Sequence, residues 1–246
     1  MILDNFPKAL WINMDKSVER RKYMQQLLDI YKINHTRISA INGVDRPMTE
    51  LQLYCRSNRR LRPSENACTA SHFKALKYFV ENMTDDKIII FEDDVSFEFL
   101  KYIPFNWSQL EKNFPPNYNV IQLAISTWGG TVTNNLVKYT KEKKYYCTAA
   151  YLITRKAAIE PIDKYFSKTF YKLDLSNTVN ATADTALYSL PNTFSIPIFT
   201  YQAYDSTIHT SHLDAHISSK NQQLNIWKLT GNKMNIPLFF SKFEKN

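Results

Sequence analysis

Three consecutive carboxylates, Glu92, Asp93 and Asp94, end an apolar run at residues 88–91. The run consists of isoleucines and a phenylalanine, which is typical of a strand covered on both faces. Adjacent like charges repel each other, so carboxylates that leave a buried strand need partners. A divalent cation supplies them, and oxygen ligands suit Mg²⁺ or Mn²⁺. Because ligands of open α/β sheets bind beyond the carboxyl ends of the strands, the pattern predicts a cation site here.

The segments before this strand predict a βαβ unit. Residues 9–14 are typical of a first strand, and residues 35–40 are typical of a second. Between them we expect a helix over about residues 16–31, with Asp15 as its cap. A βαβ unit implies that its two strands run parallel.

Strands and helices continue to alternate along the rest of the chain. The helix before the acidic strand is expected to begin at Pro63, with Ser64 as its cap. Further elements are expected as strands at 119–124, 145–154 and 194–200, and as helices at 155–166 and 184–190. This alternation predicts an α/β fold, a Rossmann-type three-layer α/β/α sandwich with a mostly parallel central sheet. We expect one domain over residues 1–246, with residues 206–246 as an appendage or a tail that contacts a partner or substrate.

Glycine content and charge restrict the kind of ligand. The chain has only four glycines, and none forms a GxGxxG or GxxxxGK pattern, so a backbone phosphate cradle is not expected. The net charge of +8 suits a phosphorylated substrate, an anionic membrane or a nucleic acid. Lysines are spread along the chain, and the densest basic cluster, residues 56–62, is short. We therefore do not expect a nucleic-acid partner, and this cluster is either a phosphate contact or a solvated surface.

The cysteines and the chain start bear on the compartment. Cys55, Cys68 and Cys147 are odd in number and show no close metal-ligand spacing, and we expect Cys68 and Cys147 to be reduced core residues. No signal peptide and no apolar run of membrane-spanning length is visible. We expect a cytoplasmic protein or a domain of a longer protein.

Four segments together resemble glycosyltransferase family 25, which includes lipooligosaccharide and collagen hexosyltransferases. They lie in order between about residues 8 and 205, and they are Trp-Ile-Asn-Met-Asp at 11–15 with Glu-Arg-Arg at 19–21, Ser-Glu-Asn-Ala-Cys-Thr-Ala-Ser-His at 64–72, Phe-Glu-Asp-Asp-Val at 91–95, and Ala-Ala-Tyr-Leu-Ile-Thr-Arg at 149–155 with Ala-Ala at 157–158. The sequence departs from the family at Ser64, Ala67 and Ala149, where glycine is common.

The resemblance implies a GT-A fold and a metal-dependent, inverting hexosyltransferase. It implies UDP-galactose or UDP-glucose as donor, bound Mn²⁺ (or Mg²⁺), and a glycan, lipid-linked saccharide or hydroxylysine hydroxyl as acceptor. Two other functions stay open: a metal-dependent nucleotide or phosphate hydrolase that uses the same acids, and a non-catalytic basic binding module with the same fold.

By this resemblance the acidic residues would bind the metal and the donor. Asp94 is the expected direct ligand, with Glu92 beside it, and an acidic turn after a strand is the simpler interpretation. Glu92 and Asp93 would reach the metal, its waters or the ribose hydroxyls. His209 is the candidate third ligand from a late loop, although a surface histidine is an equal alternative.

The remaining candidates lie on other segments. Asn13 would lie near the uridine, or be an ordinary turn residue. Ser71 and His72 would lie near the donor, although a core histidine is the usual outcome for His72 on an apolar helix face. Asp184 is the candidate general base, with a helix-start acid as the alternative. Two further acids are held in reserve for that role, Asp174 and Asp205.

Overall fold

The computed structural model describes residues 2–43, 49–143, 145–166, 173–176, 182–202 and 213–243. The helices are α1 Val18–Ile30, α2 Thr49–Tyr54, α3 Pro63–Asn82, η1 Glu98–Tyr102, α4 Trp107–Glu111, η2 Lys141–Lys143, α5 Arg155–Tyr165, α6 Ala183–Tyr188, α7 Leu213–Thr230, η4 Gly231–Lys233 and α8 Ile236–Ser241. The strands are β1 Ala9–Asn13, β2 His35–Ser39, β3 Cys55–Arg56, β4 Lys87–Glu92, β5 Val95–Ser96, β6 Val120–Gln122, β7 Ser126–Thr127, β8 Val137–Lys138, β9 Tyr145–Tyr146, β10 Ala150–Thr154, β11 Leu173–Asp174, β12 Thr193–Ser195 and β13 Thr200–Tyr201.

The central sheet has seven strands in the order β2-β1-β4-β10-β6-β12-β8. β1 lies parallel to both β2 and β4, and β12 lies parallel to β6. β10 is antiparallel to both of its neighbours, and β8 is antiparallel to β12. Five strands therefore point one way and two point the other way, which confirms the predicted α/β fold with a mostly parallel sheet. The predicted βαβ unit is also confirmed, with Ala9 paired to His35 at its start.

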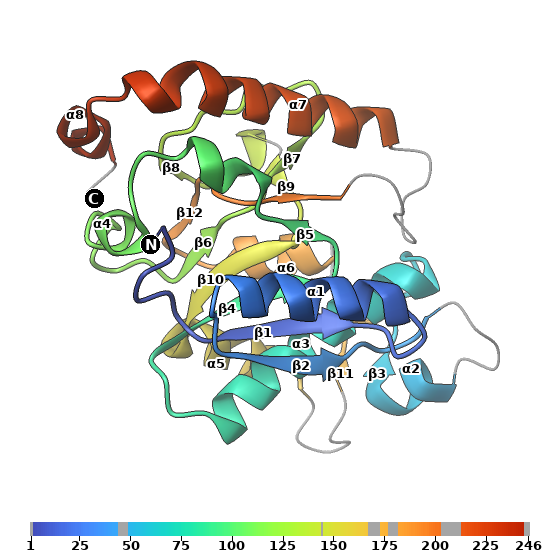
Figure 1. Ribbon diagram of the computed structural model, residues 1–246. Helices are drawn as coiled ribbons and strands as arrows, with labels where there is room; N and C mark the ends of the chain where they lie inside the picture. Colours follow the sequence, from blue (N-terminus) through green and yellow to red (C-terminus); the bar gives the residue numbers. More distant parts are fainter. Residues whose placement is uncertain are drawn as a thin grey trace.

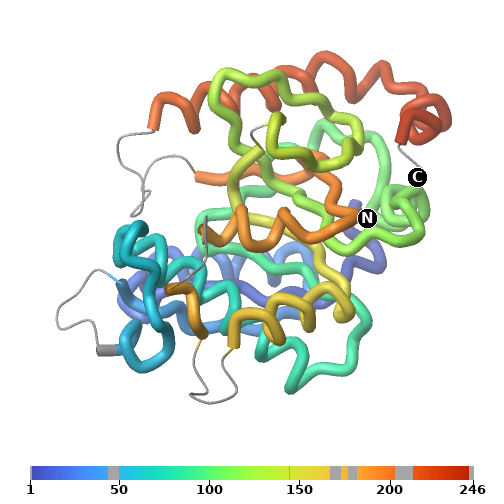
Figure 2. Tube along the Cα trace, turned by 180° about the vertical axis from the view of Figure 1, so that it is seen from behind, coloured from blue at the N-terminus to red at the C-terminus, as the bar shows by residue number. Residues whose placement is uncertain are grey.

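Side chains of β4 alternate between two apolar layers, because successive residues of a strand point to opposite faces. Ile88 and Ile90 pack with residues of α3, α5 and α6. Ile89 and Phe91 pack with residues of α1, α4, α7 and α8. Figure 1 shows α1 in front of the sheet, and Figure 2 shows α5 and α6 on the opposite side. The acidic strand is thus buried on both faces, as its sequence predicts.

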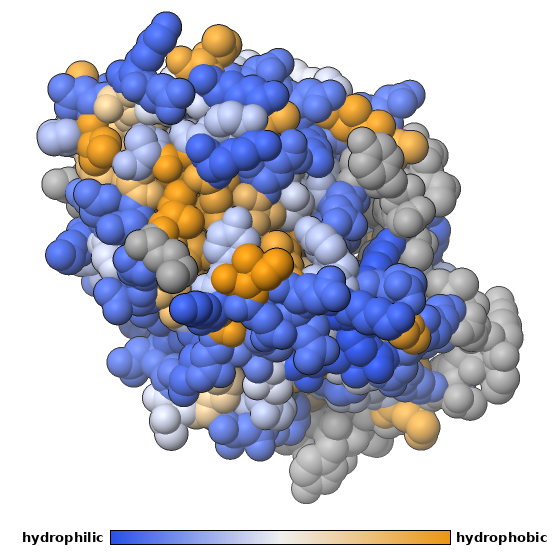
Figure 3. All heavy atoms as spheres, viewed as in Figure 1, coloured by the Kyte–Doolittle hydropathy of each residue, from blue (hydrophilic) through white to orange (hydrophobic). Residues whose placement is uncertain are grey.

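The C-terminal helices pack onto the α1 side of the sheet. Trp227 of α7 is fully buried, and its Nε1 donates a hydrogen bond to the carbonyl of Pro197 at 2.7 Å. Phe239 and Phe240 of α8 are also buried. The face in Figure 3 is mainly hydrophilic, with apolar side chains gathered mostly in its left half. Within the described ranges, no helix has the length and apolar character needed to cross a bilayer.

Two strands predicted as continuous are divided in the structure. Residues 145–154 form β9 and β10, which belong to different sheets, because the backbone turns at Cys147 with φ of 93°. A β-branched or aromatic run does not reveal such a turn, since positive φ is rare outside glycine. Residues 194–200 are likewise divided between β12 and β13.

Both predicted helix caps are wrong. α1 begins at Val18 after Ser17, and the carboxylate of Asp15 instead accepts hydrogen bonds from Arg37 and Ser39. α3 begins at Pro63, but its N-cap residue is Arg62, whose backbone N–H donates to Glu65. Asp15 does not cap α1 because it binds Arg37 and Ser39. Ser64 does not cap α3 because Pro63 takes the first helical position, which places Ser64 inside the helix.

Candidate functional site

The acidic segment lies at the carboxyl edge of the parallel strands, where the arrow of β1 points in Figure 1. Ile12 pairs with Glu92 in the register of β1 and β4, so Asn13 and Asp93 emerge side by side. A pocket of about 130 Å³ opens here. Its lining comes from β1, α1, the segment after β2, α3 and all three acids. The structure thus brings together most of the predicted site residues, namely Asn13, Ser71, His72, Glu92, Asp93 and Asp94.

Asp93 is held by two side chains from the βαβ unit. Its Oδ2 accepts from Asn13 Nδ2 at 2.7 Å, and its Oδ1 accepts from Arg20 Nη1 at 3.1 Å. Burial raises the pKa of Asp93, although the bonds from Asn13 and Arg20 oppose that effect. Asp93 is therefore fixed in place by protein groups before any ligand arrives.

Asn13 itself is completely hydrogen-bonded. Its Nδ2 also donates to the carbonyl of Ser17 at 3.1 Å, and its Oδ1 accepts from Arg37 Nε at 2.9 Å and from Arg21 Nε at 3.3 Å. An amide offers two donors and one acceptor oxygen with two lone pairs, and all are used here. Asn13 lines the pocket, but its side chain mainly orients Asp93 and the start of α1.

Asp94 has a different environment from its neighbours. Its Oδ1 is buried and, among the described residues, has no hydrogen-bond partner. Burial, followed by the charges of Glu92 and Asp93, raises the pKa of Asp94 to about 8. A buried carboxylate oxygen without a donor is unfavourable unless a cation occupies the space beside it. The residues therefore fit the divalent cation that the acidic motif implies.

Glu92 is part of a buried hydrogen-bonded chain. His72 lies between Tyr151 and Glu92, with Nδ1 3.1 Å from the Tyr151 hydroxyl and Nε2 3.2 Å from Glu92 Oε1. The Thr148 hydroxyl donates to the same Glu92 oxygen. Burial raises the pKa of Glu92, but the hydrogen bond and charge of His72 outweigh it, so the net pKa is lowered. Glu92 is thus ionised at neutral pH.

Ser71 has a structural position at the pocket wall. Its Oγ accepts from the backbone N–H of Ile41 at 2.8 Å and donates to the carbonyl of Ala67 at 2.7 Å. The bond from Ile41 ties the segment after β2 to α3, whereas the bond to Ala67 stays within α3. Gly43 lies in this segment, and a Cβ there would approach the Pro63 carbonyl oxygen to 2.3 Å, so the close packing requires glycine.

Some of the site residues predicted late in the chain lie within the described ranges, and others do not. His209 and Asp205 lie outside the described residues. Directly after β13, the backbone N–H of Gln202 donates to the carbonyl of Asp94 at 2.7 Å. The chain therefore leaves β13 directly beside the acidic segment.

Asp184 lies in the first turn of α6 and does not line the pocket. Its Oδ1 accepts from the Thr182 hydroxyl at 2.7 Å and from the backbone N–H of Thr185 at 2.8 Å. Its charge contributes to the raised pKa of Cys68, which burial raises first and Glu92 raises next. Asp184 is therefore near the α3 side of the pocket, although it does not touch it.

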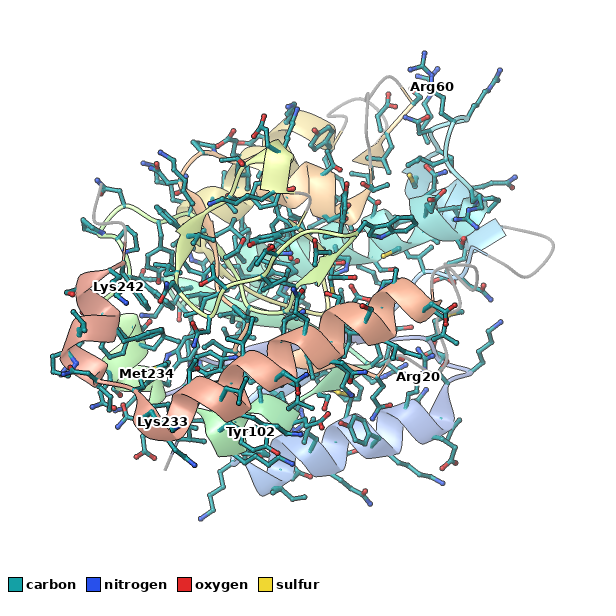
Figure 4. All side chains as sticks on the ribbon, turned by 90° about the horizontal axis from the view of Figure 1, so that it is seen from above. Arg20, Arg60, Tyr102, Lys233, Met234 and Lys242 are labelled. Carbon is teal, nitrogen blue, oxygen red and sulfur yellow. The ribbon has the colours of Figure 1, made fainter. Side chains whose placement is uncertain are left out.

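Asp174 is the reserve candidate for the general base that lies within the described ranges, and its carboxylate already has partners. It accepts from the Ser176 hydroxyl at 2.6 Å and pairs with Arg56 at 3.5 Å. Arg56 belongs to the basic cluster, and Figure 4 shows that Arg60 of the same cluster extends outward at the edge of the molecule, well apart from Arg20 on α1.

Several residues that hold the acids have no role in the prediction from sequence. Arg20 is one of them, and it pairs with Asp93 at 3.1 Å. Thr148 and Tyr151 received no role, although both belong to the chain of hydrogen bonds around Glu92. Strand alternation places Tyr151 on the α3 side of the sheet, but only the pairing of β10 with β4 brings it near His72.

The chain matches one protein family over most of its length. The model of "Glycosyltransferase family 25 (LPS biosynthesis protein)" matches residues 6–177. No curated protein matches the sequence.

Similar solved structures include A197 from STIV, at 14% identity and a TM-score of 0.41 over 78% of this chain and 83% of that one. A glycosyltransferase involved in glycosylation of the major capsid of PBCV-1 is 10% identical, with a TM-score of 0.43 over 87% and 98% of the two chains. An active-site mutant of LgtC is 9% identical, with a TM-score of 0.35 over 87% and 95%. The family match covers most of the chain and includes the acidic segment, α3 and β10, so this chain is a glycosyltransferase and belongs to glycosyltransferase family 25.

Proposed function

We propose that this glycosyltransferase moves galactose or glucose from a UDP-sugar to an acceptor hydroxyl, with inversion at the anomeric carbon and with the help of Mn²⁺ or Mg²⁺. One observation carries the proposal: the buried Oδ1 of Asp94 has no partner among the described residues, and Asp94 lines the same pocket as Glu92 and Asp93. That arrangement suits a cation, and a cation in turn suits the diphosphate of a nucleotide sugar.

Asp94, together with Glu92, would hold the cation. When bound, the cation neutralises negative charge that develops on the departing diphosphate. Glu92 contributes a carboxylate that its hydrogen bonds to His72 and Thr148 keep ionised and oriented. Binding of the cation would also replace the repulsion among the three acids, which raises the pKa of Asp94, by attraction.

The nucleoside part of the donor would occupy the pocket between β1 and α3. Arg20 and Asn13 fix the carboxylate of Asp93, and each carboxylate oxygen retains a second lone pair for a ribose hydroxyl. Ser71 would support this wall of the pocket through its bonds to Ile41 and Ala67. These side chains bind and orient, and none of them needs to exchange a proton during the reaction.

Asp184 would take the proton from the acceptor hydroxyl. An inverting transfer requires a base on the side opposite to the leaving group. The bonds that Thr182 and Thr185 donate to Oδ1 fix the direction of the Asp184 carboxylate. The acceptor is a glycan, a lipid-linked saccharide or a hydroxylated side chain. His209 completes the cation site in this proposal.

The test is a panel of UDP-sugars incubated with the protein and either Mn²⁺ or a chelator. Release of UDP and of the free or transferred sugar is measured by chromatography. We expect release from UDP-galactose or UDP-glucose that stops when the chelator is added. If no UDP-sugar is hydrolysed or transferred in a metal-dependent way, the proposal is wrong. If phosphate is released from nucleotides without sugar transfer, the protein is a phosphohydrolase.

A further inference from the structure

A second group of potential metal ligands lies beside Asp94. Cys68 and His72 are one turn apart on α3, so their side chains share one face of the helix. Glu92 ends β4 directly opposite that face. The ligand atoms of these three residues all lie within 4.8 Å of one another, and Asp94 does not belong to this group.

His72 is oriented as a metal-binding histidine usually is. Its ring is buried, and its Nδ1 lies 3.1 Å from the hydroxyl of the equally buried Tyr151. In the metal-free protein a proton lies between Nε2 and Glu92 Oε1, 3.2 Å apart. A bound ion would take the place of this proton, while Nδ1–H would donate to the Tyr151 hydroxyl. Ligating histidines commonly donate their other ring N–H to a fixed acceptor, which sets the tautomer and the ring direction.

Glu92 and Cys68 are also positioned to bind an ion. Thr148 donates to the Glu92 oxygen that faces His72 and so fixes the direction of this carboxylate. Cys68 is a free thiol that lines the pocket, so an ion can reach its sulfur from solvent through the pocket. Burial raises the pKa of this thiol, and a bound ion would displace its proton to solvent.

We propose that Cys68, His72 and Glu92 form a site for a thiophilic divalent cation, with Zn²⁺ as the representative ion. Sulfur, nitrogen and one carboxylate oxygen form the ligand set of a tetrahedral zinc site with three protein ligands and an open fourth position. Mg²⁺ and Mn²⁺ prefer oxygen ligands, so this site is chemically distinct from the one that Asp94 would form. All three residues line the pocket, so a fourth ligand would come from it.

The site has a consequence for donor binding, and this consequence rests on the proposed function. Glu92 belongs to both groups of ligands, and the wall formed by Cys68 and His72 belongs to the pocket that the nucleotide would occupy. An ion held by Cys68 removes Glu92 from the donor site and fills part of the pocket. Zn²⁺ and the UDP-sugar therefore exclude each other, which makes the site inhibitory.

The direct test is titration of the metal-free protein with Co²⁺, which replaces Zn²⁺ and reports thiolate ligation through a near-ultraviolet sulfur-to-cobalt charge-transfer band. We expect this band in the wild type and its bleaching by Zn²⁺. Cys68→Ala should abolish it. Cys55→Ala is the matched control, because Cys55 is a free cysteine buried in a separate apolar cluster, and it should leave the band unchanged.

Tyr151→Phe distinguishes ligation from general damage to the pocket. It keeps all three ligands and removes only the hydroxyl that orients His72, so the band should persist while affinity falls by about 10–100-fold. Protection of Cys68 from alkylation by Zn²⁺ in the wild type, measured by peptide mass spectrometry, needs no variant and remains informative if a variant does not fold. Absence of the band in the wild type, its survival in Cys68→Ala, or unprotected alkylation would each overturn the site.

A final experiment separates the site from its consequence. Binding of UDP-galactose or UDP-glucose is titrated with Mn²⁺ present, with and without Zn²⁺. Zn²⁺ should weaken donor binding in the wild type and not in Cys68→Ala. If the cobalt band is present but Zn²⁺ leaves donor binding unchanged, the inhibitory role is wrong. If no donor binds at all, the proposed function fails, and the cobalt result still stands.

Discussion

Replacing Asp94 with asparagine removes an ionisable group that the fold holds in an unfavourable place. Burial and the charges of Glu92 and Asp93 raise its pKa from 3.8 to about 8. The folded chain therefore keeps a proton on Asp94 at pH values where the unfolded chain has lost it. For such a group the free energy of unfolding is highest at low pH and falls as pH rises from about 4 to about 8.

The size of the effect follows from this shift. While the folded form binds one more proton than the unfolded form, the free energy of unfolding decreases by about 1.4 kcal/mol per pH unit. Between pH 5 and pH 7 the wild type should lose up to about 3 kcal/mol through Asp94 alone. Asp94→Asn lacks this loss, so the variant should become more stable relative to the wild type by that amount over the same interval.

The assay is urea unfolding of both proteins at pH 5 and pH 7 with a chelator present. Other titrating groups occur in both proteins and largely cancel in the difference. Asp174→Asn is the matched control, because the hydrogen bond from Ser176 lowers the pKa of Asp174. The stabilisation that Asp174 provides is lost only below pH 5. The free energies of unfolding of the wild type and Asp174→Asn should therefore differ by the same amount at pH 5 and pH 7. If the wild type and Asp94→Asn differ equally at both pH values, Asp94 is not the buried, repelled carboxyl described here.

Three further substitutions test other parts of the account. Asp184→Asn should abolish sugar transfer and leave binding of the UDP-sugar unchanged in calorimetry, and loss of binding would contradict its role as base. Trp227→Ala should lower the free energy of unfolding by about 3–5 kcal/mol, because a fully buried ring and its hydrogen bond to Pro197 are lost. A change below about 1 kcal/mol in urea unfolding would show that α7 does not support the core. Gly43→Ala should destabilise by about 1–3 kcal/mol, since its Cβ would lie 2.3 Å from the Pro63 carbonyl oxygen, and thermal unfolding measures this.

The sequence predicts most of the fold because its strands are nearly continuous apolar runs. The βαβ unit, the buried acidic strand and α3 all occur where the hydrophobic pattern places them. The pattern fails at Cys147, where a single residue with positive φ divides one expected strand between two sheets. It also fails for α7, whose mixed polar sequence conceals a helix anchored by a few buried side chains such as Trp227.

The candidate site is predictable in its acids and not in their partners. Glu92, Asp93 and Asp94 are adjacent in the chain, so their mutual repulsion can be inferred from the sequence. The sequence does not show that Asn13 and Arg20 bind Asp93 while Asp94 is left without a partner among the described side chains. That difference arises because β1 and β4 are neighbours, which places Asn13 beside Asp93, and because Asp93 and Asp94 lie in the turn between β4 and β5.

Asp94 should make donor binding depend on a divalent cation. Calorimetric titration of UDP-galactose and UDP-glucose into the wild type should show binding with Mn²⁺ and none with a chelator. Asp94→Asn, which should be folded and at least as stable as the wild type without metal, should bind neither donor under either condition. Binding by the wild type that is equal with and without Mn²⁺, or metal-dependent binding that persists in Asp94→Asn, would contradict the account.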